Sequence, residues 1–478
     1  MIKDFFKNFT LYGLVPVLNK GVGFILIPIY THYLTPKDFG VQGIFTSFVL
    51  LMNYFINLEV YSGVGRYFYE CKTLDERKIL ISTGLIFQLV TTIIVIVIIS
   101  TNHLFINDIL LSSQAYLSIY WIVILTIPFS ATYGFFSVLM RYENRPKKFL
   151  IVTVLQLFVK LFFIVYFIVF LRTGIIGIFY GQLLGLIVGD SGYFFILRKY
   201  FLLKFDISKI KILLKYSLPL VPGLLIIGFE PNISKYIIRT ELSIRAVGIY
   251  SFALRLVSIL VLIGFALKMT WQPFFFENVK KKGSNFSKTK EIYFIFLNIF
   301  LFMCAILTLF SKEAVMLVSP KTYWEAANLV GILSLYYTAY NLKDITIIGA
   351  NYSNKTSQVS YIKFLTVIII TAILYLFVRK YGILIIPVGY ATAGIITLLL
   401  SMKITKKYLG IQFQWLYTIL GFGFIAILNA AIIMFDISLQ IRILIFFIFI
   451  LSWFTLMKYK MSNYDVYLRR IFRLNRAQ

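Results

Sequence analysis

The chain is dominated by long apolar stretches that recur from one end to the other. Residues 79–107 contain no formal charge, and hydrophobic residues make up 60% of the 478 positions, whereas charged residues make up 14%. An ordinary globular protein has about 45–50% apolar and 25% charged residues. A soluble fold of this length cannot bury so much apolar surface, so we expect a lipid bilayer to solvate it.

Hydropathy predicts an all-α integral membrane protein with about 14 transmembrane helices, because each span needs roughly 20 apolar residues. The predicted spans are 11–34, 42–64, 79–100, 117–139, 149–171, 174–197, 216–240, 246–270, 291–311, 326–348, 359–378, 382–402, 415–435 and 440–457. The first apolar stretch carries Lys20 and lacks a small-residue cleavage site, so we interpret it as an uncleaved span.

Alternate connections between the spans differ in charge, and this difference indicates the orientation. With the N-terminus inside, 31 of the 47 Lys and Arg residues lie in cytoplasmic segments and 7 lie in external connections. Membrane proteins concentrate Lys and Arg in their cytoplasmic loops. We therefore predict that both termini are cytoplasmic. Most of the net charge of +28 then reports topology, and we expect no nucleic-acid partner.

A faint internal repeat suggests two related halves. Pro16 is followed 24 residues later by Gly40, and Pro222 is followed 26 residues later by Gly248. A six-span offset preserves orientation, so the halves would be parallel repeats about an axis along the membrane normal, with a cleft between them. The predicted units are an N-terminal lobe (1–197), a basic cytoplasmic linker (198–215), a C-terminal lobe (216–402), and two further helices with a basic cytoplasmic tail (403–478).

Thirteen charged residues fall inside the predicted spans, where each costs about 2.5–3.5 kcal/mol at a helix centre on insertion scales. Nine are cations and four are acids, so the interior has a net charge of +5, which favours an anionic cargo. Lys235 and Arg239 are four residues apart and share one face of a helix. Four of the cations lie near span ends, where long side chains can reach the lipid headgroups; they are Arg239, Lys268, Lys363 and Arg442.

The acidic residues inside the spans leave two interpretations open. Asp190 serves either a coupling ion (H⁺ or Na⁺) or a salt bridge between helices, and the same two roles stay open for Glu230, Lys343 and Asp344. Glu230 lies five residues before Lys235, too far around the helix for a direct pair. Lys343 and Asp344 are adjacent and point apart, so we expect each to have another partner.

Other residue types exclude several kinds of site. Cys71 and Cys304 fall in a loop and in a span, which rules out a disulfide framework. His32 and His103 lie in separate short segments without ligand spacing, so we expect no metal, no cofactor and no catalytic residue. The sixth span carries glycines at every fourth position, which predicts close helix packing; they are Gly177, Gly181, Gly185 and Gly189.

Six short motifs, in this order along the predicted spans, resemble the polysaccharide-unit flippases of the multidrug/oligosaccharidyl-lipid/polysaccharide (MOP) exporter superfamily. The likeness covers most of the chain and is strongest in 33–70 and 213–277. The seventh span departs from the pattern, since it has Glu230-Pro-Asn-Ile-Ser-Lys235 where many relatives have an aspartate-arginine pair. The motifs are Tyr33-Leu-Thr-Pro-Lys-Asp-Phe-Gly-Val41, Gly65-Arg66-Tyr67-Phe-Tyr69-Glu70, Arg141-Tyr-Glu-Asn-Arg145, Leu213-Leu-Lys-Tyr-Ser-Leu-Pro219-Leu-Val-Pro222, Val247-Gly-Ile-Tyr250-Ser-Phe-Ala-Leu-Arg255 and Trp271-Gln-Pro273-Phe.

The resemblance implies two six-helix lobes around a central cavity, with two extra C-terminal helices. It implies a non-enzymatic flippase of the bacterial inner membrane that exports an undecaprenyl-diphosphate-linked oligosaccharide of O-antigen or capsule type by alternating access. Its partners would be that polyprenyl-diphosphate-linked glycan and membrane lipids, and the protein would be a monomer, alone or beside polysaccharide assembly proteins. By the same resemblance, five cations line the cavity; they are Lys20, Arg66, Lys235, Arg239 and Arg255.

Three alternatives stay open at this stage. A lipid II flippase of the same superfamily is barely distinguishable by sequence. A cation-coupled drug antiporter should carry acids in its N-terminal lobe, where Glu59 and Asp190 are the only acids in spans. A membrane polysaccharide polymerase or glycosyltransferase usually needs large loops outside the membrane, whereas the longest predicted external connection, 101–116, has 16 residues.

Overall fold

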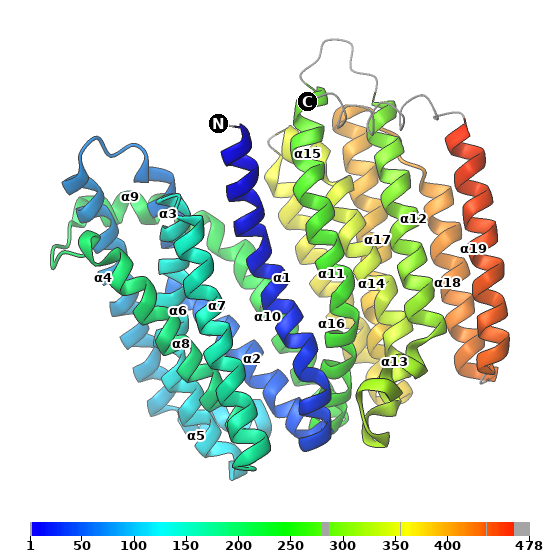
Figure 1. Cartoon of the computed structure of the whole chain (residues 1–478), viewed down its shortest axis with the longest axis horizontal. Coiled ribbons are helices and arrows are strands. Elements are labelled where there is room, and N and C mark those ends of the chain that lie inside the picture. Colours follow the sequence, from blue (N-terminus) through cyan, green and yellow to red (C-terminus); the bar gives the residue numbers. More distant parts are fainter. Residues whose placement is uncertain (1, 280–285, 354, 436, 463–478) are drawn as a thin grey trace.

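The computed structural model describes residues 2–279, 286–353, 355–435 and 437–462, and these residues form helices with no strand among them (Figure 1). The long helices match the predicted spans in order and place. They are α1 (Ile2–Tyr33), α2 (Pro36–Asn57), α4 (Leu74–Thr101), α6 (Leu117–Tyr142), α7 (Pro146–Val165), α8 (Ile176–Leu197), α10 (Val221–Glu241), α11 (Ile244–Val279), α12 (Ser287–Leu309), α14 (Ala327–Thr346), α16 (Thr356–Tyr381), α17 (Ile385–Leu409), α18 (Trp415–Phe435) and α19 (Leu439–Ser462).

Length and apolar composition allow ten helical segments of the described residues to cross a membrane. One of them, Ser357–Leu409, holds both α16 and α17, and Leu439–Trp453 of α19 is a shorter apolar helix. The long helices α1 and α14 lie outside that set. The prediction of an all-α, multi-pass membrane protein is therefore confirmed, and fourteen stands as an approximate number of spans.

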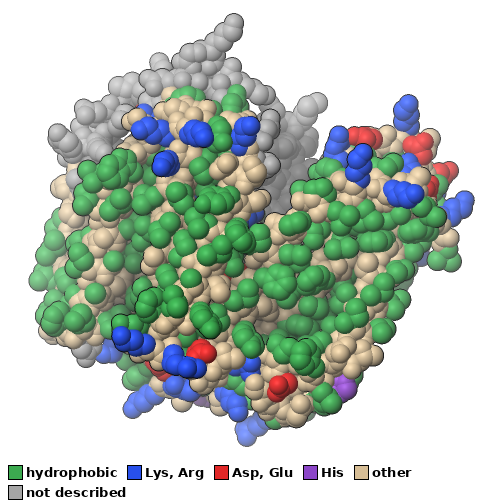
Figure 2. All heavy atoms as spheres, turned by 180° about the vertical axis from the view of Figure 1, so that it is seen from behind, with side chains coloured by type: hydrophobic (Ala, Val, Ile, Leu, Met, Phe, Trp, Pro, Cys, Tyr) green, Lys and Arg blue, Asp and Glu red, His purple; other side chains and the backbone are tan. Residues whose placement is uncertain are grey.

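The helices run roughly parallel between two ends of the molecule (Figure 1). We call one end the linker end, because it carries the start of α1 and the short helix α9 (Ile207–Ser217). We call the other the hairpin end, because α1 turns into α2 there and α10 turns into α11. Charged side chains gather at both ends, and the surface between them is mostly hydrophobic (Figure 2). Such a band is what a bilayer-spanning surface requires.

The surface is notched between the two halves at the linker end (Figure 2). One half contains α2 to α9, the other contains α11 to α19, and α1 and α10 lie between them (Figure 1). The halves are joined mainly where α2 packs on α11 and on α10. The helices therefore diverge from a contact near the hairpin end.

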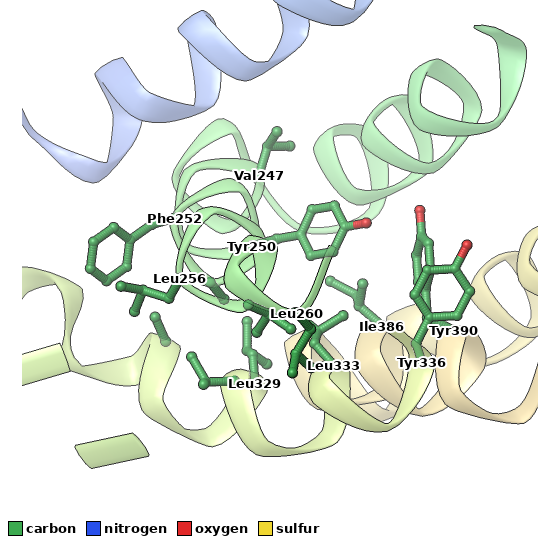
Figure 3. Packing of buried hydrophobic residues seen from close by; sticks show 14 of the residues in the cluster. Val247, Tyr250, Phe252, Leu256, Leu260, Leu329, Leu333, Tyr336, Ile386 and Tyr390 are labelled. Carbon is green, nitrogen blue, oxygen red and sulfur yellow. The ribbon is translucent and has the colours of Figure 1, made fainter. Parts of the chain in front are cut away.

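Packing inside the C-terminal half is built around α11, α14 and α17. Leu256 and Leu260 of α11 lie against Leu333 of α14 (Figure 3). The rings of Tyr336 and Tyr390 meet edge to face, with centroids 5.0 Å apart, beside this apolar layer (Figure 3). Edge-to-face contacts suit the electrostatics of aromatic rings. This layer positions the hydroxyl of Tyr390 for the polar contacts described below.

Close packing of α7 against α8 confirms the expectation drawn from the glycines of the sixth span. A Cβ atom on Gly181 would lie 2.5 Å from Ile164 Cγ1 and 2.7 Å from Ile164 N. A Cβ on Gly185 would lie 2.7 Å from Lys160 Cβ. A Cβ on Gly177 would lie 2.7 Å from Phe167 Cβ, just beyond the end of α7. Small residues thus allow the two backbones to approach closely.

Three predicted segments contain short helices that hydropathy did not reveal. The predicted second span, 42–64, breaks where Leu58 and Glu59 adopt left-handed backbone angles, with φ of 40° and 58°, and α3 (Val60–Phe68) follows. The predicted connection 101–116 folds into α5 (His103–Leu111). The predicted linker 198–215 contains most of α9, which packs on α3 and α4. The division into lobes and linker stays a prediction.

Candidate functional site

The two halves approach most closely where α2 crosses α11, through two glycines. A Cβ atom on Gly40 would lie 2.1 Å from the carbonyl oxygen of Ile244, and one on Gly248 would lie 1.6 Å from that of Pro36. The contact is therefore reciprocal. Gly40 packs on the carbonyl of Ile244, four residues before Gly248, and Gly248 packs on the carbonyl of Pro36, four residues before Gly40. Only glycine permits such an approach of two helix backbones. These are the two glycines that the internal repeat singled out in the sequence.

Further contacts hold the end of α1 against the C-terminal half. Thr31 Oγ1 donates a hydrogen bond to Val318 O, 2.6 Å away, in α13 (Ser311–Val318). Tyr323 Oη, in the short helix η5 (Lys321–Ala326), donates to Leu34 O over 2.8 Å. The hairpin end is thus closed by backbone-to-backbone packing of α2 on α11 and by hydrogen bonds that join the end of α1 to the C-terminal half.

Lys235 of α10 reaches across this contact to α2. Its ammonium group donates to Gly43 O at 2.7 Å and to Ser47 Oγ at 2.5 Å, and the side chain is 9% exposed. The neighbouring Asn232 Nδ2 donates to Ser47 O at 2.9 Å. A buried ammonium group needs such acceptors, because transfer out of water without them is costly. Lys235 therefore fastens α10 to the N-terminal half.

Arg239 and Arg255 also bind the N-terminal half. Arg239 Nη1 donates to Ser112 Oγ, in the turn after α5, and the side chain is 9% exposed. Arg255 Nη2, on α11, donates to Gln42 Oε1 of α2 at 3.2 Å. The guanidinium of Arg255 also lies 4.8 Å from the ring centroid of Phe39, within cation–π range. The structure thus brings three of the five predicted cavity cations to one interface.

Both arginines keep a buried donor without a partner among the described residues. These atoms are Arg239 Nε and Arg255 Nη1. Almost all buried polar groups in proteins are hydrogen-bonded, so an unpaired guanidinium donor calls for an explanation. Lys160 of α7 and Lys235 both lie within electrostatic range of Arg255. A cluster of positive charge with spare donors can accept an anion, and guanidinium groups suit the oxygens of phosphate.

Of the remaining two predicted cavity cations, only Arg66 has a side chain among the described residues. Lys20 is on α1, and its side chain is outside the described residues. Arg66 is on α3 at the linker end, where it is exposed and forms an ion pair of 2.5 Å with Glu70. Arg66 is therefore not brought together with Lys235, Arg239 and Arg255.

The predicted coupling residues of the C-terminal half surround a pocket of about 240 Å³ between α10, α14 and α16. Tyr390 Oη donates to Glu230 and lies 3.0 Å from Ser234 Oγ. Lys343 lies 5.0 Å from the ring centroid of Tyr340. The pocket therefore contains both acidic and basic groups, which offset each other.

Asp344 has the separate partner that its position in the sequence suggested, an ion pair with Lys268 of α11. Arg442 differs from the expectation that it reaches the headgroups. It turns inward, donating to Glu313 Oε1 at 2.6 Å, to Glu313 Oε2 at 2.8 Å and to Leu309 O at 2.7 Å. A two-pronged contact with a carboxylate is more favourable than exposure at the membrane surface. The Lys268–Asp344 pair therefore joins α11 to α14, and the Arg442–Glu313 pair joins α19 to α13.

Asp190 of α8 lies beside Thr132 of α6, inside the N-terminal half. Within the described ranges Asp190 has no ion-pair partner, and its Oδ1 is buried without a hydrogen bond. Neither of the two roles weighed for Asp190 is decided by these contacts.

Sequence reasoning missed the acceptors that the cations bind. Gln42, Gly43, Ser47 and Ser112 are ordinary residues in an apolar context, and each is 100 or more positions from its partner in the chain. No local pattern marks them. Two polar residues within the apolar sequence of α2, Gln42 and Ser47, are the signal available before the structure.

Comparisons with known proteins give both a family and a fold. The lipid II flippase MurJ, in an inward closed conformation, matches with a TM-score of 0.75 and 13% identity, over 95% of this chain and 100% of that chain. An inward-facing multidrug resistance MATE family transporter of the MOP superfamily matches with a TM-score of 0.63 and 15% identity, over 81% and 94%. Identities this low establish the fold alone.

A search of curated protein sequences found no match. The profile of the family described as "Polysaccharide biosynthesis protein" matches residues 5–279, which is more than half of the chain. Together with the apolar helices, these findings indicate a multi-pass membrane protein. The chain belongs to the polysaccharide biosynthesis protein family and has the fold of the MOP superfamily.

Proposed function

We propose that this protein is a flippase that moves a polyprenyl-diphosphate-linked oligosaccharide from the inner to the outer leaflet of the bacterial cytoplasmic membrane by alternating access. The cargo would be a unit of polysaccharide synthesis, such as one for O-antigen or capsule. The family supports a role in polysaccharide biosynthesis, and the fold is that of transporters. The identity of the cargo rests on the chemistry of the interface between the two halves.

One observation carries the proposal: the buried guanidinium group of Arg255 keeps an unpaired donor at the contact between the halves, within electrostatic range of Lys160 and Lys235. Retaining uncompensated positive charge within a membrane is costly unless a ligand or water meets it. A diphosphate has several anionic oxygens and fits this need. A cationic drug does not, because it would add positive charge to the same place.

The arrangement of the halves supports a direction of transport. If the linker end is cytoplasmic, as the charge distribution predicts, then the notch faces the cytoplasm and the closed hairpin end faces outward. The cargo would reach the cations from the inner leaflet, and separation of α2 from α11 would release it. Moving negative charge outward is favourable by about 2.3 kcal/mol per charge per 100 mV in an inside-negative membrane.

A coupled H⁺ or Na⁺ ion is part of the same proposal, as a second source of driving force. Asp190 is the residue we assign to it first, because it is acidic, has a buried carboxylate oxygen without a hydrogen bond, and forms no ion pair among the described residues. Glu230 is the second choice, since Tyr390 already donates to it. Asp344 is occupied by Lys268 and is assigned a structural role.

The test is a reconstituted transport assay. Proteoliposomes receive a fluorescent undecaprenyl-diphosphate oligosaccharide, and its transfer between leaflets is measured by protection from an impermeant reagent. We expect transfer by the wild type and a loss of about tenfold or more in Arg255→Ala, since each buried charge–phosphate contact contributes more than 1.4 kcal/mol. Lys211→Ala removes a cation from the exposed face of α9 and serves as the matched control.

Parallel arms separate the alternatives. Transfer of lipid II in preference to other lipid-linked sugars would replace the proposed cargo with lipid II. Efflux of a small cationic dye without transfer of any lipid-linked glycan would overturn the proposal in favour of a drug antiporter. Release of polymerised or newly linked glycan would indicate an enzyme.

A further inference from the structure

A second cavity lies beside the cation cluster, between the N-terminal half and α10. Its volume is about 660 Å³, and its walls come from α2, α4, α5 and α10. Phe48 and Phe55 of α2, Ile94 and Ile98 of α4, and Phe229 of α10 are typical of its lining. We call it the lateral groove. Pockets of roughly 300–1,000 Å³ bury ligands of drug size, so the groove is large enough for a stretch of a long chain.

The lining of the groove is almost entirely apolar, which suits a hydrocarbon ligand. Only Thr91, Asn232, Lys235 and Tyr236 among its lining residues carry an N–H or O–H group in the side chain. The first three use their donors on protein acceptors: Thr91 donates to Ile56 O at 2.8 Å, while Asn232 and Lys235 bind α2. Apolar surface that is covered by an apolar ligand contributes roughly 25 cal/mol per Å².

The groove opens sideways, towards the lipid. Ile94 and Ile98 line the groove and are 52% and 54% exposed. The lining residues of α4 lie in the last three turns of that helix and those of α10 lie in its middle and second half, and both helices end at the hairpin end. On the predicted topology this part of the groove lies in the outer half of the bilayer.

The groove also meets the cation cluster at its inner wall. Lys235 lines the groove with its stem, and its ammonium group lies at the contact between α10 and α2. A lipid-linked diphosphate has a charged head that must sit between the halves and a long chain that must stay in hydrocarbon. Such a cargo requires a lateral opening next to the cations, and the groove has this position.

We infer that the lateral groove binds the isoprenoid chain of the cargo on the outer-leaflet side, with the diphosphate beside Lys235. This inference rests on the proposed function and adds a specific site for the chain. The Ile side chains and phenyl rings of the lining offer apolar contacts to the methyl-branched isoprene units, and Lys235 at the inner wall matches the diphosphate to which the chain is joined. The bound isoprenoid chain thereby keeps the cargo attached to the protein while the diphosphate and its glycan cross the membrane.

Two substitutions on the same helix test the groove. Ile98→Trp places a large ring into the groove, whereas Ile93→Trp adds the same ring on a neighbouring face that is 62% exposed and outside the lining. We expect Ile98→Trp to slow transfer of the lipid-linked oligosaccharide about tenfold and Ile93→Trp to leave it within about twofold. Equal rates in the two variants, with an active wild type, would overturn the inference.

Photocrosslinking gives a readout that does not depend on transport. A polyprenyl diphosphate with a diazirine in its chain is activated in proteoliposomes of the wild type, and the labelled peptides are identified by mass spectrometry. We expect labels on α4 and α10 within the groove, and their loss when unlabelled polyprenyl diphosphate is added in excess.

The outcomes separate the two proposals. Groove labelling without any transfer would retain the chain site and refute the proposed function. Transfer without groove labelling would refute the chain site alone. Equal labelling by a diazirine phospholipid, not displaced by polyprenyl diphosphate, would show that the groove holds a bilayer lipid and would also overturn the inference.

Discussion

The closure of the hairpin end depends on Gly248, and a single methyl group should prevent it. The Cβ of alanine at this position would lie 1.6 Å from Pro36 O and 2.6 Å from Pro36 C. A carbon–oxygen contact needs roughly 3.3 Å, so α2 and α11 would have to part by about 1.7 Å. Both clashing atoms are backbone, so no flexible side chain can move aside.

The energy of this clash is large enough to shift the balance between conformations. Overpacking in a rigid contact costs typically about 1–3 kcal/mol, and the backbone clash places Gly248→Ala at the upper end. A change of about 3 kcal/mol corresponds to roughly 100-fold in an equilibrium constant. Because the clash exists only in the closed arrangement, we expect Gly248→Ala to open the hairpin end.

Pulsed electron paramagnetic resonance measures the opening directly. Spin labels are attached at Leu104 of α5 and Leu317 of α13, which are 53% and 86% exposed and lie on opposite halves near the hairpin end. The background carries Cys71→Ala and Cys304→Ala, since both native cysteines are free and buried. We expect the distance between the labels to increase in Gly248→Ala.

Two further variants test whether the opening is specific to the contact between α2 and α11. Gly134→Ala is the control, because a Cβ there has nothing within 4 Å. Gly40→Ala tests the mirror-image contact and should open the same end, since its Cβ would lie 2.1 Å from Ile244 O. An unchanged distance distribution in well-folded Gly248→Ala and Gly40→Ala would refute the idea that these glycines govern closure.

Three other predictions concern stability. Arg442→Met should lower the melting temperature by removing one partner of a buried pair, at about 3–5 kcal/mol, and adding Glu313→Gln should restore part of it; additive losses would contradict the pairing. Gly181→Ala should destabilise the α7–α8 contact by about 1–3 kcal/mol, whereas Gly134→Ala should not; equal melting temperatures would argue against that packing. Hydrogen bonds from Ser208 and from the backbone of the first turn lower the pKa of Asp206, so its stabilisation of α9 should be present above about pH 4 and be lost as the pH falls through the lowered pKa. Hydrogen exchange of α9, corrected for intrinsic rates, should show this loss in the wild type but not in Asp206→Asn, whose amide caps without titrating.

Much of the fold could be predicted because hydropathy is a local property. Each long helix has an apolar run of its own, and the bilayer requires its backbone to be hydrogen-bonded internally, so the run alone predicts the helix. The helices α3, α5 and α9 were missed because they are short and polar on one side. The break at Leu58 and Glu59 was missed because no glycine or proline marks the left-handed turn.

The candidate site was predictable only in part. Lys235, Arg239 and Arg255 stood out because charge within an apolar span is unusual, and they do lie together. Their acceptors did not stand out, since Ser47 and Gln42 differ in no way from other polar residues of a membrane helix. Arg66 lies apart from these three cations and pairs with Glu70 four residues later, a contact that helical spacing alone suggests; its role at the site stays a prediction.

The sequence by itself determined that this chain is a multi-pass helical membrane protein with an excess of buried positive charge, because composition and local hydropathy decide how a chain meets a bilayer. Only the tertiary structure decided where that charge is used. The crossing of α2 and α11 through Gly40 and Gly248 brings residues about 200 positions apart into contact. Contacts of that kind depend on how whole helices pack, and no local pattern contains them. The same packing created the lateral groove beside Lys235, and with it a place for a lipid chain.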